Sequence, residues 1–145
     1  MKAVAEILKA KPIKDVVTIS PDAPVYDAIK LMADYGIGAL VVMEDERIVG
    51  MVTERDYARK VVLMNRSSST TMVREIMSED VLYVRPTDSN ESCMAIMTEN
   101  RLRHLPVIEN DKLVGIISIG DLVKDIISEQ QFIIHQLERY IAGGG

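Results

Sequence analysis

The sequence predicts an α/β protein built from two copies of one β-α-β-β-α unit. The first observation is an internal repeat, because residues 16–62 align with residues 81–127 at a constant offset of 65 without a gap. The second is the helical spacing of apolar residues after the first short β-rich run of each copy. The third is a pair of β-rich runs separated by four polar residues, which is typical of a hairpin. Each copy should therefore form a three-stranded sheet with two helices on one face, and the two sheets should pack against each other.

Each element can be justified in chain order. A short helical signature precedes each copy, at residues 4–8 and 73–77. The first strand is predicted at Val16–Ile19 and at Val81–Val84, and turn signals at residues 20–22 and 85–87 end it. The buried face of the next helix is predicted from apolar residues three or four positions apart, namely Val25, Ala28, Ile29 and Met32 in the first copy and Cys93, Met94, Ile96 and Met97 in the second.

Two hairpins and a second helix complete the copies. The predicted strand pairs are Ala39–Met43 with Ile48–Val52, and Leu105–Ile108 with Leu113–Ile117. The second helix opens at Thr53 in the first copy and at Ser118 in the second. We therefore predict a first repeat over residues 1–62, a polar Ser/Thr-rich linker over 63–72, a second repeat over 73–127 and a helical extension over 128–145.

From Asp121 the helical pattern of apolar residues continues to the glycines at 143–145, so the last helix is predicted to run for about 20 residues, or roughly 30 Å. Its apolar residues exceed what one repeat can cover, which predicts a homodimer that buries them. They are Leu122, Val123, Ile126, Ile127, Phe132, Ile133, Ile134, Leu137, Tyr140 and Ile141.

Composition limits the function classes. The 145 residues are 48% hydrophobic and 27% charged, with 8 Gly and 5 Pro, which excludes disordered and collagen-like chains. A net charge of −5, one Phe, five Tyr and no Trp disfavour a nucleic-acid-binding surface. We find no metal-ligand cluster, no Walker loop and no nucleophile elbow, so we expect neither an enzyme nor a catalytic cofactor. No signal peptide or membrane span is apparent, and the single Cys93 fits a reducing compartment, so a cytoplasmic location is expected.

Both hairpins end in the same motif, Gly-h-h-[Ser/Thr]-x-x-Asp, at residues 50–56 and 115–121. One interpretation is a capping box at the start of the following helix. The other is a binding site, in which the helix start and the hydroxyl hold a phosphate while the aspartate accepts hydrogen bonds from a ribose diol. The residues alone leave both open.

This motif, its repetition and the segment RLRHLPV at 101–107 resemble a tandem pair of CBS domains, the Bateman module, and the chain is similar to stand-alone bacterial and plant CBS-pair proteins. The resemblance implies a regulatory module that binds an adenosine-containing ligand such as AMP, ATP or NAD in the cleft between the repeats. It implies that Asp56 and Asp121 hold ribose hydroxyls and that Thr53 and Ser118 hold phosphate.

Further site residues follow from the same resemblance. The edges of the first strands would line the adenine pockets, through Val17, Thr18, Ile19, Leu82 and Val84. The hairpin starts would face the ligand, through Gly38 and Ala39 in the first copy and Arg103, His104, Leu105 and Pro106 in the second. The first copy has no basic side chain at this point, so Arg55, Arg59 or the second copy's Arg103 and His104 would supply positive charge. The two sites should therefore differ.

Three functions remain to be separated. The first is a nucleotide sensor that signals to its own dimer or to an unidentified regulated protein, with no nucleic acid or membrane as a partner. The second, implied by the plant relatives, is regulation of a redox enzyme of the thioredoxin system. The third is a structural dimerisation unit without a ligand, whose Ser/Thr and Asp residues act only as helix caps.

Overall fold

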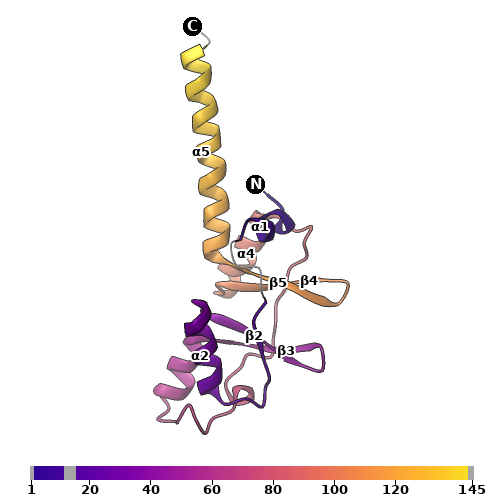
Figure 1. Cartoon of the computed structure of the whole chain (residues 1–145), viewed down its shortest axis with the longest axis vertical. Helices are drawn as coiled ribbons and strands as arrows, with labels where there is room; N and C mark the ends of the chain where they lie inside the picture. Colours follow the sequence, from indigo (N-terminus) through magenta and orange to yellow (C-terminus); the bar gives the residue numbers. More distant parts are fainter. Residues whose placement is uncertain (1, 12–15, 144–145) are drawn as a thin grey trace. The chain divides into compact units, whose positions relative to one another are not determined.

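The secondary structure repeats with the offset found in the sequence (Figure 1). The computed structural model describes residues 2–11 and 16–143. Met1, residues 12–15 and residues 144–145 lie outside the described part, and with them a piece of the predicted first repeat and the last two glycines. Matching elements start 65 residues apart, as with Val25 and Asn90 or Arg47 and Lys112, so the predicted α/β fold with two copies of one unit is confirmed.

The chain divides into two compact units that do not follow the order of the sequence. One unit is Asp15–Leu82, and the other combines Met1–Lys14 with Tyr83–Gly145. Helix α1 (Val4–Ala10) therefore packs on the second copy, where Val4 and Ile7 join the core. The 3-10 turn Val73–Glu75 packs on the first copy, where Val73 and Ile76 join the core. Each copy thus receives the segment that precedes the other copy.

The unit formed by residues 15–82 holds a three-stranded sheet in the order β1-β2-β3. Strand β1 (Thr18–Ile19) runs parallel to β2 (Ala39–Glu44), and β2 pairs antiparallel with β3 (Arg47–Thr53). Helix α2 (Val25–Tyr35) packs on the sheet, and its buried residues Val25, Ala28 and Met32 are among those predicted. Helix α3 (Glu54–Tyr57) follows β3 and continues into a π-helical turn, Ala58–Val62.

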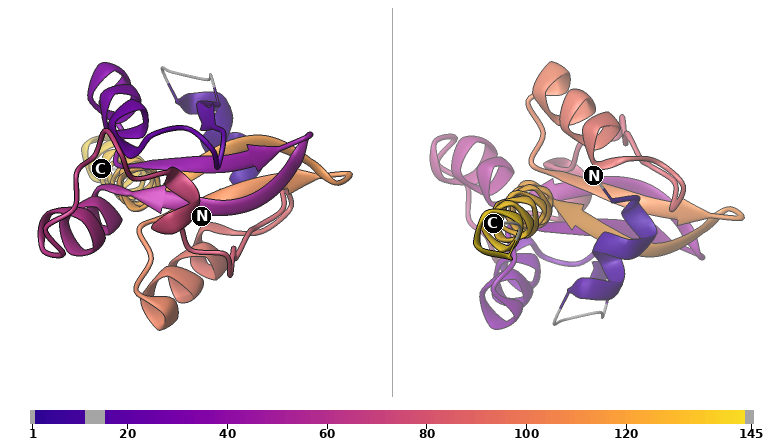
Figure 2. Two further views of the ribbon diagram at one scale, coloured as in Figure 1. Left: turned by 90° about the horizontal axis from the view of Figure 1, so that it is seen from below. Right: turned by 90° about the horizontal axis from the view of Figure 1, so that it is seen from above.

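The other unit holds the antiparallel hairpin of β4 (His104–Glu109) and β5 (Lys112–Ser118). In Figure 2 this hairpin, drawn in orange, runs between α1 on one side and α4 (Asn90–Asn100) on the other. Asn110 and Asp111 at its tip have φ angles of +52° and +62°, and Asp45 and Glu46 at the other tip have +49° and +65°. Positive φ at both central residues is the two-residue hairpin geometry that matches the strand twist.

The predicted strand Val81–Val84 is wrong for most of its length. Only Val84 pairs, in an isolated parallel bridge with Val107, where Val84 N–H donates to Pro106 O (3.0 Å). The next rung would need an N–H from Pro106, and proline has none. The first copy has Val41 at the equivalent position, and there β1 extends the pairing to Thr18.

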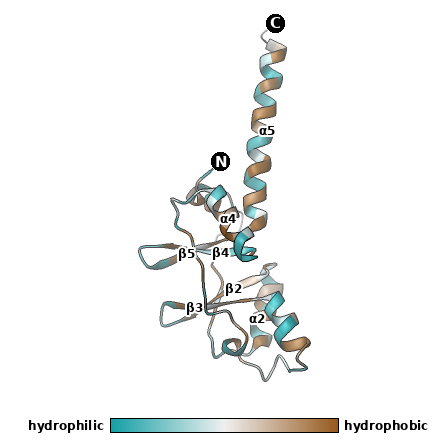
Figure 3. Cartoon of the chain, turned by 180° about the vertical axis from the view of Figure 1, so that it is seen from behind, coloured by the Kyte–Doolittle hydropathy of each residue, from teal (hydrophilic) through white to brown (hydrophobic). Residues whose placement is uncertain are grey.

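Helix α5 (Ile119–Gly143) has 25 residues and projects well beyond α1 and α4 (Figure 1). Leu122 and Asp125 are buried, whereas every described side chain from Gln130 onward is exposed. Figure 3 shows hydrophobic bands reaching the far end of this helix. The helix starts directly after Ser118, where the sequence predicts that it opens. Among the described residues, no helix is both long and apolar enough to span a membrane.

Candidate ligand-binding site

The two motif aspartates occupy matching strand-to-helix junctions. In the first copy, Thr53 N–H donates to Asp56 Oδ2 (3.0 Å) and Asp56 N–H donates to Thr53 Oγ1 (3.1 Å). In the second, Ser118 N–H donates to Asp121 Oδ2 (2.8 Å) and Asp121 N–H donates to Ser118 Oγ (3.1 Å). Both pairs are reciprocal capping boxes, so one of the two interpretations of the motif is confirmed. Both aspartates remain partly accessible, with 14% and 15% of their side chains exposed.

A lysine forms an ion pair with each motif aspartate. Lys60 Nζ lies 3.2 Å from Asp56 Oδ1 and donates to Ile76 O (2.8 Å). Lys11 Nζ lies 2.9 Å from Asp121 Oδ2 and donates to Ile116 O (2.9 Å). Each lysine thus links the strand-to-helix junction of its unit to the segment that precedes the other copy in the sequence. Neither lysine is among the site residues predicted from the sequence.

His104 lies in the electrostatic surroundings of the Asp121 junction. Burial lowers the pKa of His104 below its usual 6.5, and the positive charge of Lys11 lowers it further. Asp121 opposes this shift, while Arg103 adds to it. His104 is therefore a neutral, half-buried imidazole near neutral pH.

This environment predicts a pH-dependent stability. Since the unfolded chain binds a proton on His104 at higher pH than the folded chain, the free energy of unfolding should fall as the pH drops through about 6.5. Urea unfolding between pH 7.5 and 5.5 should show that His104→Asn flattens this part of the profile. His135→Asn is the matched control, because His135 lies on the exposed part of α5. An identical slope in wild type and His104→Asn would contradict the prediction.

The remaining predicted site residues fall into two groups. Five have buried side chains and can offer only backbone groups to a ligand: Ile19, Ala39, Val84, Leu105 and Pro106. Eight are at least partly accessible: Val17, Thr18, Gly38, Arg55, Arg59, Leu82, Arg103 and His104. Strand β1 lies at the edge of its sheet, which leaves the backbone of its outer side unpaired by the sheet. His104 pairs with Ser118 in the register of β4 and β5, three residues before Asp121. No described carboxylate forms an ion pair with Arg55, Arg59 or Arg103.

The glycine of the motif has a packing role. A Cβ built on Gly50 would lie 2.7 Å from Ser78 O and 2.8 Å from Met77 Sδ. A Cβ on Gly115 would lie 2.9 Å from Leu8 Cδ2. In both copies the received segment packs against the glycine of the last strand: at Gly50 the missing side chain makes room for a backbone carbonyl, and at Gly115 it makes room for the Leu8 side chain.

Cys93 behaves as a structural thiol. It is buried in the core of its unit on the inner face of α4. Burial raises the pKa of Cys93 to about 11, so the thiol stays protonated and unreactive near neutral pH. Within the described residues, no group of three or more His, Cys, Asp or Glu side chains could hold a metal ion.

Comparison with known proteins identifies what this architecture resembles. The CBS domain family matches the chain twice, at residues 4–63 and 73–128. The mitochondrial CBS domain-containing protein CBSX3 of Arabidopsis thaliana is 41% identical over 128 residues, which cover 85% of this chain and 62% of that protein. The chain therefore spans less than two thirds of that relative.

Two solved structures share the fold. A candidate signal-transduction protein with CBS domains from Burkholderia ambifaria is 58% identical and superposes with a TM-score of 0.86, covering 89% of this chain and 96% of its own. The hexameric CBS-CP12 protein from bloom-forming cyanobacteria is 29% identical with a TM-score of 0.76, and it covers 100% of this chain and 89% of its own.

Proposed function

The chain belongs to the CBS domain family, and we propose that it is a regulatory module that binds an adenosine nucleotide, AMP, ATP or NAD, at its strand-to-helix junctions. One observation carries the proposal. Both units place a hydroxyl N-cap, an accessible aspartate and a lysine ammonium together at the end of a hairpin. Carboxylate oxygens accept hydrogen bonds from a ribose diol, and an ammonium balances phosphate charge.

The relatives support a regulatory role. The Burkholderia structure is described in terms of signal transduction, and the family resemblance implies adenosine ligands. We assign Asp56 and Asp121 to the ribose and Thr53 and Ser118 to the phosphate. No catalytic step belongs to the proposal. A cytoplasmic location is part of it, although the Arabidopsis relative is described as mitochondrial.

The module also self-associates in this proposal. The apolar side chains on the far half of α5 are 50% to 77% exposed and include Ile133, Leu137 and Tyr140. Such a stripe is stabilised when a second copy covers it, so we propose a homodimer through α5. The hexameric cyanobacterial neighbour, which covers the whole chain, supports self-association. The regulated protein is unidentified, and a redox enzyme is one candidate class.

The alternative is a structural dimerisation unit without a ligand, which the complete capping boxes favour. Thermal unfolding with a panel of AMP, ATP, NAD, GMP and GTP separates the two. A nucleotide sensor should melt at higher temperature with adenine nucleotides, by a shift that grows with ligand concentration, because the ligand binds only the folded state. An unchanged melting temperature with every nucleotide would contradict the sensor and favour the structural unit.

A further inference from the structure

One face of α5 is exposed along nearly the whole helix and has a regular pattern. Its residues are spaced alternately four and three positions apart, which is the spacing of a helix that packs along a second helix. These residues, which we call the α5 seam, are Val123, Ile127, Gln130, Ile134, Leu137 and Ile141. The five apolar members are 41% to 76% exposed, and Gln130 is exposed as well. The seam therefore offers a second helix a contact along 19 residues, or roughly 28 Å.

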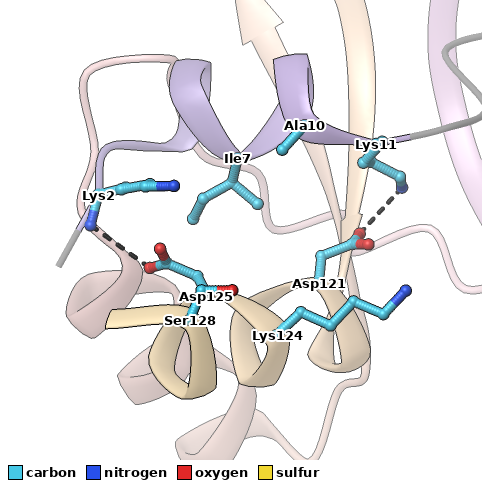
Figure 4. Close-up of a pocket in the computed structure, with 8 residues that line it drawn as sticks. All are labelled: Lys2, Ile7, Ala10, Lys11, Asp121, Lys124, Asp125 and Ser128. Atoms are coloured by element: carbon cyan, nitrogen blue, oxygen red, sulfur yellow. Dashed lines mark hydrogen bonds and ion pairs between the residues drawn. The ribbon is translucent and has the colours of Figure 1, made fainter. Parts of the chain in front are cut away.

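The two rows of residues beside the seam differ in chemistry. The row on one side is apolar and consists of Ile126, Ile133 and Tyr140. The row on the other side is polar and consists of Lys124, Gln131 and Glu138. Figure 4 shows the Lys124 side chain extending away from Asp125, which turns toward Lys2. Among the described residues, no carboxylate forms an ion pair with Lys124 and no cation forms one with Glu138.

The direction of a second helix decides which rows face each other. In a parallel pair, the apolar row of one helix lies beside the polar row of the other. In an antiparallel pair, the two apolar rows meet on one side of the seam and the two polar rows meet on the other. Only the antiparallel pair therefore covers Ile133 and Tyr140, which are 50% and 77% exposed, with apolar neighbours. It also brings the positive Lys124 of one helix to the negative Glu138 of the other, which a parallel pair holds about 21 Å apart.

One antiparallel register fills the seam completely. Its two-fold axis is level with residue 132, and the pairs along the seam are Val123 with the partner's Ile141, Ile127 with the partner's Leu137, and Gln130 with the partner's Ile134. In this register Lys124 and the partner's Glu138 are offset by about 3 Å along the helix axis, a distance that their flexible side chains span. Gln130 and Gln131 of both chains surround the two-fold axis, where their amides donate to and accept from one another. The one polar residue of the seam is therefore satisfied.

We infer that two chains associate through an antiparallel pairing of their α5 seams, with Lys124 of each chain in an ion pair with the partner's Glu138. This inference rests on the self-association in the proposed function, and it names the surface and the register that perform it. The far end of each α5 then lies beside the start of the partner's α5, so the apolar residues at both ends of the helix are covered.

Disulfide cross-linking of the full chain distinguishes the two directions. Ile127→Cys and Leu137→Cys are made as separate variants, refolded together from urea under reducing conditions to exchange subunits, and then oxidised with copper phenanthroline. The buried Cys93 keeps its thiol protonated, so only the introduced thiols react. In the antiparallel register the mixture should cross-link in about half of its dimers. Each variant alone should not cross-link, because identical positions lie about 15 Å apart along the helix pair.

Reversing two charges tests the register independently. Lys124→Glu should weaken the association roughly tenfold in sedimentation equilibrium, because it replaces two attractive pairs by two repulsive ones. Lys124→Glu/Glu138→Lys should restore the association to within about twofold of the wild type. The two residues lie about 21 Å apart within one α5, so this restoration reports a contact between chains. Lys112→Glu, which reverses an exposed charge at the hairpin tip of the same unit, is the matched control and should leave the association unchanged.

The possible failures separate the inference from the proposed function. Cross-linking of the separate variants, a dimer that cross-links in neither the mixture nor the separate variants, or a charge reversal that does not restore the association would overturn the antiparallel register and keep the proposed dimer. A wild-type protein that sediments as a monomer at tens of micromolar would overturn this inference and the proposed self-association together.

Discussion

Replacing Gly50 by alanine should lower the free energy of unfolding by about 1–3 kcal/mol, the range that is typical of overpacking. The added Cβ would meet Ser78 O at 2.7 Å, and a backbone carbonyl cannot move aside as a flexible side chain can. The bond pair between Met51 and Ser78 (2.9 Å in both directions) would be displaced with it. Gly115→Ala should cost less, because its nearest neighbour is the end of the Leu8 side chain.

Urea unfolding followed by circular dichroism measures this effect. Gly120→Ala is the matched control, since the nearest atom to its added Cβ is Ser118 Oγ at 3.6 Å and the residue lies in α5. The control should be neutral or stabilising by up to about 1 kcal/mol, as for a helical glycine. If Gly50→Ala were as stable as the wild type, the close docking of residues 77–78 on β3 would be wrong.

Ending the chain after Ser128 should abolish self-association and leave both units folded. The residues that α5 contributes to the interior, Leu122 and Asp125, stay in the shortened chain. The exposed apolar residues beyond Ser128 are removed, and each such side chain contributes about 1.5–3 kcal/mol when fully buried. Their combined loss should weaken the dimer by far more than 100-fold.

Sedimentation velocity at tens of micromolar measures the association. Ile134→Asp should separate the dimer as the truncation does, because Ile127, Ile134 and Ile141 recur every seven residues along one face. Gln136→Asp adds the same charge to an exposed position on the opposite side of the helix from these isoleucines and should leave the dimer intact. A full-length protein that sediments as a monomer would contradict the proposed dimer.

The local spacing of apolar and polar residues predicted most of the fold. The hairpins and the inner faces of α2 and α4 followed from spacing alone, because both depend on which side of an element is buried. Pro106 could have indicated that the strand predicted before Val84 does not form, because proline has no N–H to donate to a neighbouring strand. No periodicity in the sequence predicted that each unit includes the segment preceding the other copy, because this packing joins residues that are far apart in the sequence. The glycines at positions 50 and 115 were the only sequence feature related to it.

The site could be predicted only in part. The motif placed Thr53, Asp56, Ser118 and Asp121 at equivalent junctions because the repeat fixes their local backbone. The two lysines could not be found by aligning the repeats. Lys60 follows its aspartate by one helical turn, whereas Lys11 reaches Asp121 from the end of α1.

The central claim is that this CBS-domain chain binds adenosine nucleotides. Calorimetric titration of AMP into the wild-type protein, with GMP as the control ligand and the Asp56→Ala/Asp121→Ala double variant as the control protein, tests it most directly. We expect saturable AMP binding in the micromolar range, equivalent to about −8 kcal/mol, with GMP much weaker and the double variant without measurable binding. AMP binding that is undetectable in the wild type, equal for GMP, or unchanged in the double variant would contradict the claim.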